Sequence, residues 1–165
     1  MMVTPARTAF HRRLALPDEE ATAALAGRLA GLLGPGDVLL LSGPIGAGKT
    51  SFARALIRAA TGNPAEEVPS PTFTLVQTYP APRGEIWHAD LYRLGDAGEA
   101  LELGLDAAME NAICLIEWPE ILGDLAPADA LSLAFAAGDA GHDSGHAVTL
   151  TGNAGWAARL ERHLG

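Results

Sequence analysis

Residues 43–50 read Gly43-Pro44-Ile45-Gly46-Ala47-Gly48-Lys49-Thr50 and match the pattern G-x-x-x-x-G-K-[ST] without a mismatch. Glycines let a backbone curl so that its N–H groups point inward, and at the start of a helix these donors form a concave anion site. In such a loop the ammonium group of Lys49 would contact the β- and γ-phosphates of a nucleotide, and the hydroxyl of Thr50 would bind Mg²⁺. The pattern therefore predicts a phosphate-binding loop.

The segments on either side of the loop support this interpretation. Residues 38–41 are an unbroken apolar run, which is typical of a strand buried on both faces, and residues 51–60 read as a helix. A chance glycine-rich turn is the alternative, but it explains neither the Lys-Thr pair nor the strand–loop–helix order. We assign seven residues of this region to nucleotide binding: Gly43, Gly46, Ala47, Gly48, Lys49, Thr50 and Ser51.

The identity of the base follows from the lysine content. A guanine-specific site often uses an Asn/Thr-Lys-x-Asp segment, and Lys49 is the only lysine in the chain. No such segment can therefore exist, and ATP is favoured over GTP.

Composition sets further limits. The 165 residues predict a single domain over residues 1–165, and a hydrophobic content of 48% with 19% charged residues is ordinary for a globular protein. A net charge of -9 disfavours autonomous binding to nucleic acid, although a local basic patch and docking to a basic protein stay open. The single cysteine, Cys114, has apolar neighbours, which indicates a buried structural thiol.

Two features bear on the location of the chain. It has no run of about 18 apolar residues, so we expect no membrane span. Residues 1–17 lack the continuous apolar core of a signal peptide, and we therefore expect a cytoplasmic protein.

Two acidic residues are candidates for a magnesium site because a phosphate loop works with an acid at the end of an apolar strand. Glu117 ends the run Ile113-Cys114-Leu115-Ile116, and a solvated glutamate at a strand end is the alternative. Asp90 lies in His88-Ala89-Asp90-Leu91-Tyr92-Arg93, where alternation would put His88, Asp90 and Tyr92 on one face if the strand continues. Spacing alone does not exclude the alternative that residues 88–93 belong to a polar strand at the edge of the sheet. His88 reads as a packed or hydrogen-bonding residue rather than a metal ligand.

A third segment, Ser70-Pro71-Thr72-Phe73, combines two hydroxyls with a stiffening proline. It could sense the γ-phosphate as a switch, and a plain turn before a strand is the alternative that composition alone favours.

The remaining patterns predict a mixed sheet with helices on both faces, an α/β fold. Asp18 is a plausible N-cap of a helix whose apolar positions run from 21 to 33 and which Gly34-Pro35-Gly36 would stop. Residues 73–79 and 85–91 predict an antiparallel hairpin, because the segment Pro80-Ala81-Pro82-Arg83-Gly84 between them is a turn signal. Further strands are expected at 11–16 and 112–118, and a late antiparallel strand pair at 130–136 and 147–151. A loop is expected at 138–145, with helices at 96–111 (broken near 104) and 154–164.

Together these segments resemble the TsaE (YjeE) family, the ATPase component of bacterial tRNA threonylcarbamoyladenosine synthesis. The resemblance runs from about residue 17 to 121, and H-x-D-x-Y-R with I-E-W-P carry more of it than the phosphate loop does. The matching segments are Asp18-Glu19-Glu20-Ala21-Thr22, Gly46-Ala47-Gly48-Lys49-Thr50, Ser70-Pro71-Thr72-Phe73-Thr74-Leu75-Val76, His88-Ala89-Asp90-Leu91-Tyr92-Arg93-Leu94 and Ile116-Glu117-Trp118-Pro119.

The resemblance implies a three-layer P-loop NTPase-like fold with a mixed, partly antiparallel central sheet. It implies that Thr50, Asp90 and Glu117 hold Mg²⁺, with Lys49, Asp90 and Glu117 as the catalytic residues. Thr72 would belong to the switch, and Trp118 would stack on or wall the nucleotide. Glu19 and Thr22 would approach the adenine.

Two departures from the family pattern affect these expectations. Members often carry Gly-Arg before the last strand, whereas this chain has Gly145-His146, so a nucleotide contact from that arginine does not transfer. The alignment of residues 138–145, which are rich in glycine and aspartate, is also open.

The mechanism that the resemblance implies is ATP hydrolysis with Mg²⁺, coupled to a conformational change. No arginine finger is evident, since Arg54 and Arg58 fall in the helix after the loop, so hydrolysis by the isolated chain is expected to be slow. The family implies the TsaD and TsaB subunits as partners that complete the site. A P-loop small-molecule kinase and a nucleotide-binding scaffold that never hydrolyses ATP are the alternatives.

Overall fold

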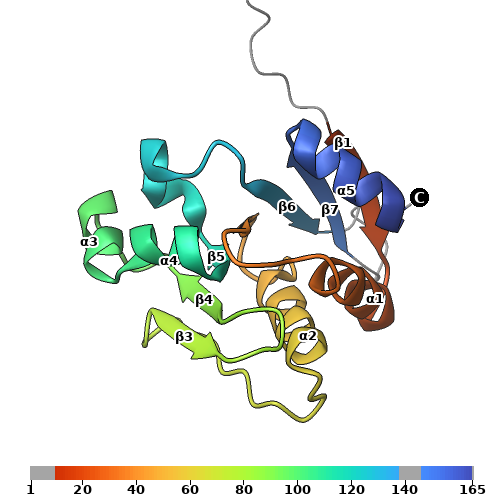
Figure 1. The fold of residues 1–165 in the computed structure, drawn as a ribbon, viewed down its shortest axis with the longest axis horizontal. Helices are drawn as coiled ribbons and strands as arrows, with labels where there is room; N and C mark the ends of the chain where they lie inside the picture. The colour runs from red at the N-terminus through yellow and green to blue at the C-terminus, as the bar shows by residue number, and fades with distance from the viewer. Residues whose placement is uncertain (1–9, 138–145, 165) are drawn as a thin grey trace, which may run out of the picture.

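The computed structural model describes residues 10–137 and 146–164, and within them a seven-stranded sheet runs in the order β1-β7-β6-β2-β5-β4-β3 (Figure 1). The strands are β1 (Phe10–Leu16), β2 (Val38–Ser42), β3 (Val76–Tyr79), β4 (Ile86–Asp90), β5 (Ile113–Glu117), β6 (Leu131–Ala137) and β7 (His146–Gly152). The helices are α1 (Glu19–Ala30), α2 (Lys49–Thr61), α3 (Ala97–Glu102), α4 (Leu105–Asn111), the 3₁₀ segment η1 (Pro119–Leu125) and α5 (Ala154–Leu164).

The sheet is mixed, as the sequence predicted. Strand β2, which leads into the phosphate loop, pairs in parallel with β5 and β6, and β4 pairs in parallel with β5. The predicted hairpin and the predicted late strand pair are confirmed as the antiparallel pairs β3–β4 and β6–β7. The first strand was predicted without a partner, and it pairs antiparallel with the last, β7 (Figure 1).

Both faces of the sheet are covered, because side chains of β2 alternate between two hydrophobic clusters. Leu39 and Leu41 pack with apolar residues of α1, α2 and α5, whereas Val38 and Leu40 pack with residues of α3, α4 and η1. A strand apolar at every position is therefore required here, since neither face is exposed to solvent. The α/β class and the covered sheet are thus as predicted.

Helix α1 begins as predicted but ends early. The Asp18 carboxylate accepts a hydrogen bond from the Ala21 N–H at 2.8 Å, which confirms the N-cap. The helix ends at Ala30, not at the predicted Gly34-Pro35-Gly36 stop, because Gly31 caps it and the chain then turns. Leu32 and Leu33 are buried although they follow the helix, so the helical spacing of apolar residues in the sequence extends past the point where the helix ends.

Both strands of the predicted hairpin are shorter in the structure, at the ends away from the turn that connects them. Strand β3 begins at Val76 rather than at 73, because residues 71–74 form a turn in which the Leu75 N–H bonds to the Pro71 carbonyl and Leu75 has a positive φ of 69°. Strand β4 ends at Asp90, so the alternation expected to include Tyr92 stops there, and Tyr92 lies in a turn and is 55% exposed.

Other boundaries moved by one or two residues, and η1 was not predicted. The loop expected at 138–145 lies outside the described residues. No described helix is long and apolar enough to cross a membrane.

Candidate active site

The candidate site lies where the parallel strands β2, β5 and β4 end. In the register of the sheet, Leu41 is opposite Glu117, and Glu117 is opposite Asp90. The phosphate loop leaves β2 directly after this register position. The carboxyl edge of a parallel sheet is where α/β proteins hold ligands, and here it brings both predicted carboxylates to the start of the loop.

The loop is shaped by glycines at positions that exclude other residues. Gly43 has φ of 128°, and a Cβ there would lie 2.3 Å from the Phe135 carbonyl oxygen of β6. Gly48 has φ of 107° and leads into α2, whose first residue is Lys49. The chain therefore turns tightly between β2 and α2 and directs the N-terminus of α2 to the strand ends, as an anion site requires.

Lys49 is only 5% exposed and points back across the loop. Its ammonium group donates a hydrogen bond to the Gly43 carbonyl and lies 3.2 Å from the ring centroid of Trp118. Desolvation lowers the pKa of Lys49, and the negative charges of Glu117, Glu120 and Asp90 oppose that shift. The loop thus carries a partly desolvated cation, which binds an anion more strongly than a solvated one does.

Glu117 is 2% exposed, and each of its oxygens has a partner. Oε1 accepts a hydrogen bond from the Thr50 hydroxyl at 2.9 Å, and Oε2 lies 2.6 Å from Nε2 of His88. The structure therefore brings together the hydroxyl and the carboxylate that the sequence had assigned to Mg²⁺. It also places His88 as a buried hydrogen-bonding residue, as predicted.

Asp90 links the strand edge to the predicted switch. Its Oδ2 accepts a hydrogen bond from the Thr72 hydroxyl at 3.2 Å, and Oδ1 accepts one from the Tyr92 N–H at 2.9 Å. The hydroxyls of Thr72 and Ser70 are 2.8 Å apart. Hydrogen bonds thus connect Ser70 and Thr72 to a carboxylate of the candidate metal site.

The donor set suits a hard cation. Thr50, Asp90 and Glu117 supply only oxygen atoms and line one cavity with Lys49, and Mg²⁺ prefers oxygen ligands together with phosphate oxygens. No group of three His, Cys, Asp or Glu side chains in residues 10–137 and 146–164 is arranged to hold a metal.

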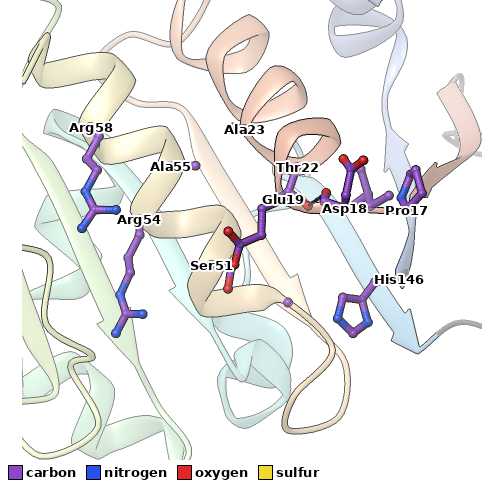
Figure 2. Close-up of a pocket in the computed structure, with 12 residues that line it drawn as sticks. Pro17, Asp18, Glu19, Thr22, Ala23, Ser51, Arg54, Ala55, Arg58 and His146 are labelled. Atoms are coloured by element: carbon purple, nitrogen blue, oxygen red, sulfur yellow. Dashed lines mark hydrogen bonds between the residues drawn. The ribbon is translucent and has the colours of Figure 1, made fainter. Parts of the chain in front are cut away.

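Two cavities meet at the phosphate loop. One, of about 340 Å³, contains the proposed phosphate and metal residues; its predicted members are Gly46, Gly48, Lys49, Thr50, Ser51, Thr72, Asp90, Glu117 and Trp118. The other, of about 410 Å³, lies between α1 and α2 and is shown in Figure 2; its predicted members are Glu19, Thr22, Gly48 and Ser51. Gly43 and Ala47 line neither cavity.

His146 lines both cavities, and the sequence did not assign it a role. Figure 2 shows it at the cavity between α1 and α2. The imidazole packs against Gly48, and its buried Nδ1 has no hydrogen-bond partner. Its place follows from topology: β7 runs antiparallel to β6, and β6 runs parallel to β2, so the first residue of β7 lies at the edge where β2 ends. The resemblance had marked this position as one where family members often carry an arginine, but the strand order is what places it beside both cavities.

Trp118 is held in an unusual conformation. It has φ of 56°, a left-handed value that is uncommon for residues other than glycine, and its ring packs against Tyr92 at an interplanar angle of 46° with centroids 4.7 Å apart. Strain of this kind clusters at binding sites, where it fixes a side chain in place. The turn after β5 thus directs an aromatic wall over Lys49.

Comparisons with known proteins agree on one family. Residues 16–145 match the family model described as "Threonylcarbamoyl adenosine biosynthesis protein TsaE". The chain is 44% identical over 112 residues to the tRNA threonylcarbamoyladenosine biosynthesis protein TsaE of Rickettsia bellii, covering 68% of this chain and 77% of that protein. It is 37% identical over 139 residues to the protein of the same name from Streptomyces coelicolor, covering 78% and 88%.

A solved structure supports the same assignment. The crystal structure of YdiB from Bacillus subtilis superposes with a TM-score of 0.76 at 27% identity and covers 94% of this chain and 97% of that one. Because the family model spans most of the chain, the protein belongs to the TsaE family.

Proposed function

We propose that this chain binds ATP with Mg²⁺ and hydrolyses it slowly, in support of tRNA N6-threonylcarbamoyladenosine modification through a TsaD–TsaB complex. One observation carries the proposal: the Thr50 hydroxyl, the Glu117 and Asp90 carboxylates and the Lys49 ammonium group line a single cavity at the phosphate loop. The names of the relatives supply the tRNA modification. On this proposal the 165 residues act as one P-loop NTPase-like domain in the cytoplasm.

Each residue has a role in the proposed reaction. Backbone N–H groups of the loop and Lys49 stabilise charge on the γ-phosphoryl group as it is transferred to water. Thr50, Glu117 and Asp90 would hold Mg²⁺, which neutralises charge on the phosphate oxygens when it is bound. Glu117 also orients the attacking water, and Thr72 senses the γ-phosphate through its bond to Asp90.

The other cavity suits the base and sugar. It adjoins Gly48 and Ser51 at the start of α2 and extends to Glu19 and Thr22 at the start of α1. A nucleotide with phosphates in the loop would extend its base toward this groove, since the two cavities share Gly48, Ser51 and His146.

Slow hydrolysis by the isolated chain follows from where the arginines lie. Nε of Arg54 donates to the Val68 carbonyl and Nε of Arg58 to the Glu66 carbonyl, which ties the loop after α2 to that helix. Arg93 lies over the Phe73 ring at 5.2 Å. None of these three lines the phosphate cavity, so a partner would supply the additional cation.

The test is a reconstituted reaction containing the TsaD–TsaB pair, tRNA and ATP, with this chain omitted as a control. Phosphate release and modified tRNA are measured together. We expect both to depend on the chain, and Lys49→Ala and Glu117→Ala to abolish the stimulated hydrolysis. Glu102→Ala, which removes an exposed acid of α3, is the matched control. Full stimulated activity in Lys49→Ala and Glu117→Ala would show that the assigned site is wrong.

A further inference from the structure

The carboxylate of Glu117 is held from two sides. Thr50, at the start of α2, donates to Oε1, and His88, on β4, contacts Oε2. Only the Thr50 side opens on the phosphate cavity, because Thr50 and Glu117 line that cavity and His88 does not. The histidine therefore approaches Glu117 from the protein interior.

His88 makes no other side-chain hydrogen bond among the described residues. It is fully buried, and its second ring nitrogen, Nδ1, has no partner. A buried nitrogen without a partner costs stability that an apolar side chain of similar size would avoid. What the imidazole provides in return is its contact with Glu117.

The register of β4 and β5 explains why this contact forms. Asp90 is paired with Glu117, so these two side chains lie on one face of the sheet. His88 is two residues before Asp90 on the same strand, so its side chain lies on that face as well. From this position the imidazole reaches diagonally across to β5, where Nε2 lies 2.6 Å from Oε2 of Glu117. His88, Asp90 and Glu117 thus form one polar cluster on an otherwise apolar pair of strands.

We propose that His88 is a positioning residue for Glu117. Its Nε2–H bond fixes the plane of the carboxylate and keeps Oε1 on the side of Thr50, the phosphates and the attacking water. The contact requires the tautomer that carries its proton on Nε2, because an ionised carboxylate only accepts hydrogen bonds. The inference rests on the proposed ATPase function and adds that the orientation of Glu117 limits turnover, not nucleotide affinity.

Two substitutions separate the hydrogen bond from the volume of the side chain. His88→Leu fills the space without a donor, whereas His88→Gln places an amide N–H near the position of Nε2. In the reconstituted reaction we expect His88→Leu to lower kcat about 10- to 100-fold with KM for ATP changed less than about 3-fold, as is usual for residues that orient metal-site ligands. We expect His88→Gln to restore most of kcat. Ile86→Val, in the core of the same strand, controls for lost stability and should leave kcat unchanged.

A second readout does not depend on activity. In the ¹⁵N-labelled wild-type chain we expect a slowly exchanging, downfield Nε2–H resonance of His88, assigned by its loss in His88→Gln. Glu117→Gln should move it upfield, because a neutral amide is a weaker acceptor than a carboxylate. A resonance that Glu117→Gln leaves unchanged would show that the contact is not made.

The two proposals fail in different ways. If the wild-type mixture hydrolyses no ATP, the proposed function fails, and the resonance still reports whether His88 holds Glu117. If the wild type is active and His88→Leu keeps kcat within about 2-fold, or if His88→Gln is as impaired as His88→Leu, positioning by this hydrogen bond is refuted.

Discussion

The ammonium nitrogen of Lys49 lies 3.2 Å from the ring centroid of Trp118. A lysine on the face of an indole is attracted by the negative face of the ring, and the attraction is stronger where both groups are desolvated. Lys49 comes from the phosphate loop and Trp118 from the turn after β5. The pair thus connects the two segments that enclose the phosphates in the proposed complex.

Trp118 should report nucleotide binding. We expect ATP with Mg²⁺ to change the intrinsic fluorescence of the protein, because a phosphate that engages Lys49 alters the surroundings of the indole. Trp118→Phe should abolish the change, and Trp156→Phe should keep it, since Trp156 is buried in α5 and bonded to the Asp129 carbonyl. A signal that persists in Trp118→Phe and disappears in Trp156→Phe would place the nucleotide elsewhere.

Thr50→Val tests the metal site with an almost isosteric change. We expect ADP affinity without Mg²⁺ to stay near the wild-type value, whereas the gain in affinity on adding Mg²⁺ shrinks about 10-fold because one oxygen ligand is lost. Titration calorimetry with and without Mg²⁺ measures this. Thr78→Val on β3, where the threonine is exposed, is the control. An unchanged response to Mg²⁺ would exclude Thr50 from the metal site.

Two glycines of the phosphate loop should differ in their tolerance of a methyl group. A Cβ on Gly43 would lie 2.3 Å from the Phe135 carbonyl oxygen, whereas a Cβ on Gly46 would meet no atom within 4 Å. We expect Gly43→Ala to lower the free energy of unfolding by about 2–4 kcal/mol and Gly46→Ala, with only positive-φ strain, by about 1 kcal/mol. Urea denaturation measures both, and equal losses would contradict the close contact between the loop and β6.

Cys114 should make stability depend on pH in the alkaline range. Burial raises the pKa of its thiol from 9.0 to about 12, so the folded protein keeps the proton at pH values where the unfolded chain loses it. The contribution of the thiol to stability is complete below pH 9.0 and is lost as the pH rises toward 12.

We therefore expect the free energy of unfolding of the wild type to fall more steeply than that of Cys114→Ala, by up to about 1.4 kcal/mol per pH unit. Urea denaturation between pH 8 and 11 compares the two, and the comparison cancels the groups that they share. Parallel curves would mean that the thiol titrates normally in the folded state.

Local sequence patterns were sufficient for much of the fold. The apolar run of β2, the Asp18 cap and the proline-glycine turn between β3 and β4 each depend on residues within a few positions of one another, and each prediction was confirmed. The ends of the strands next to the site were less predictable. Leu75 takes a positive φ that its residue type disfavours, so β3 starts later than its composition suggests.

Contacts between distant segments set the rest. The bond between Thr50 and Glu117 joins residues 67 positions apart, and the sequence indicated each partner but not their meeting. His146 reaches the site only because β7 lies beside β6, which in turn lies beside β2. Strand order depends on the summed packing of the whole chain, and no short motif encodes it.

The pairing of β1 with β7 has a consequence for synthesis on the ribosome. Residues 10–16 emerge well before residues 146–152, the strand with which they pair in the described sheet, so this edge of the sheet closes only after the later segment has emerged. Leu16 and His146, the last pair in that register, line the same groove beside α1. A nascent chain therefore lacks one wall of this groove until residues 146–152 have joined the sheet, and the proposed binding of a nucleotide has to wait for that step.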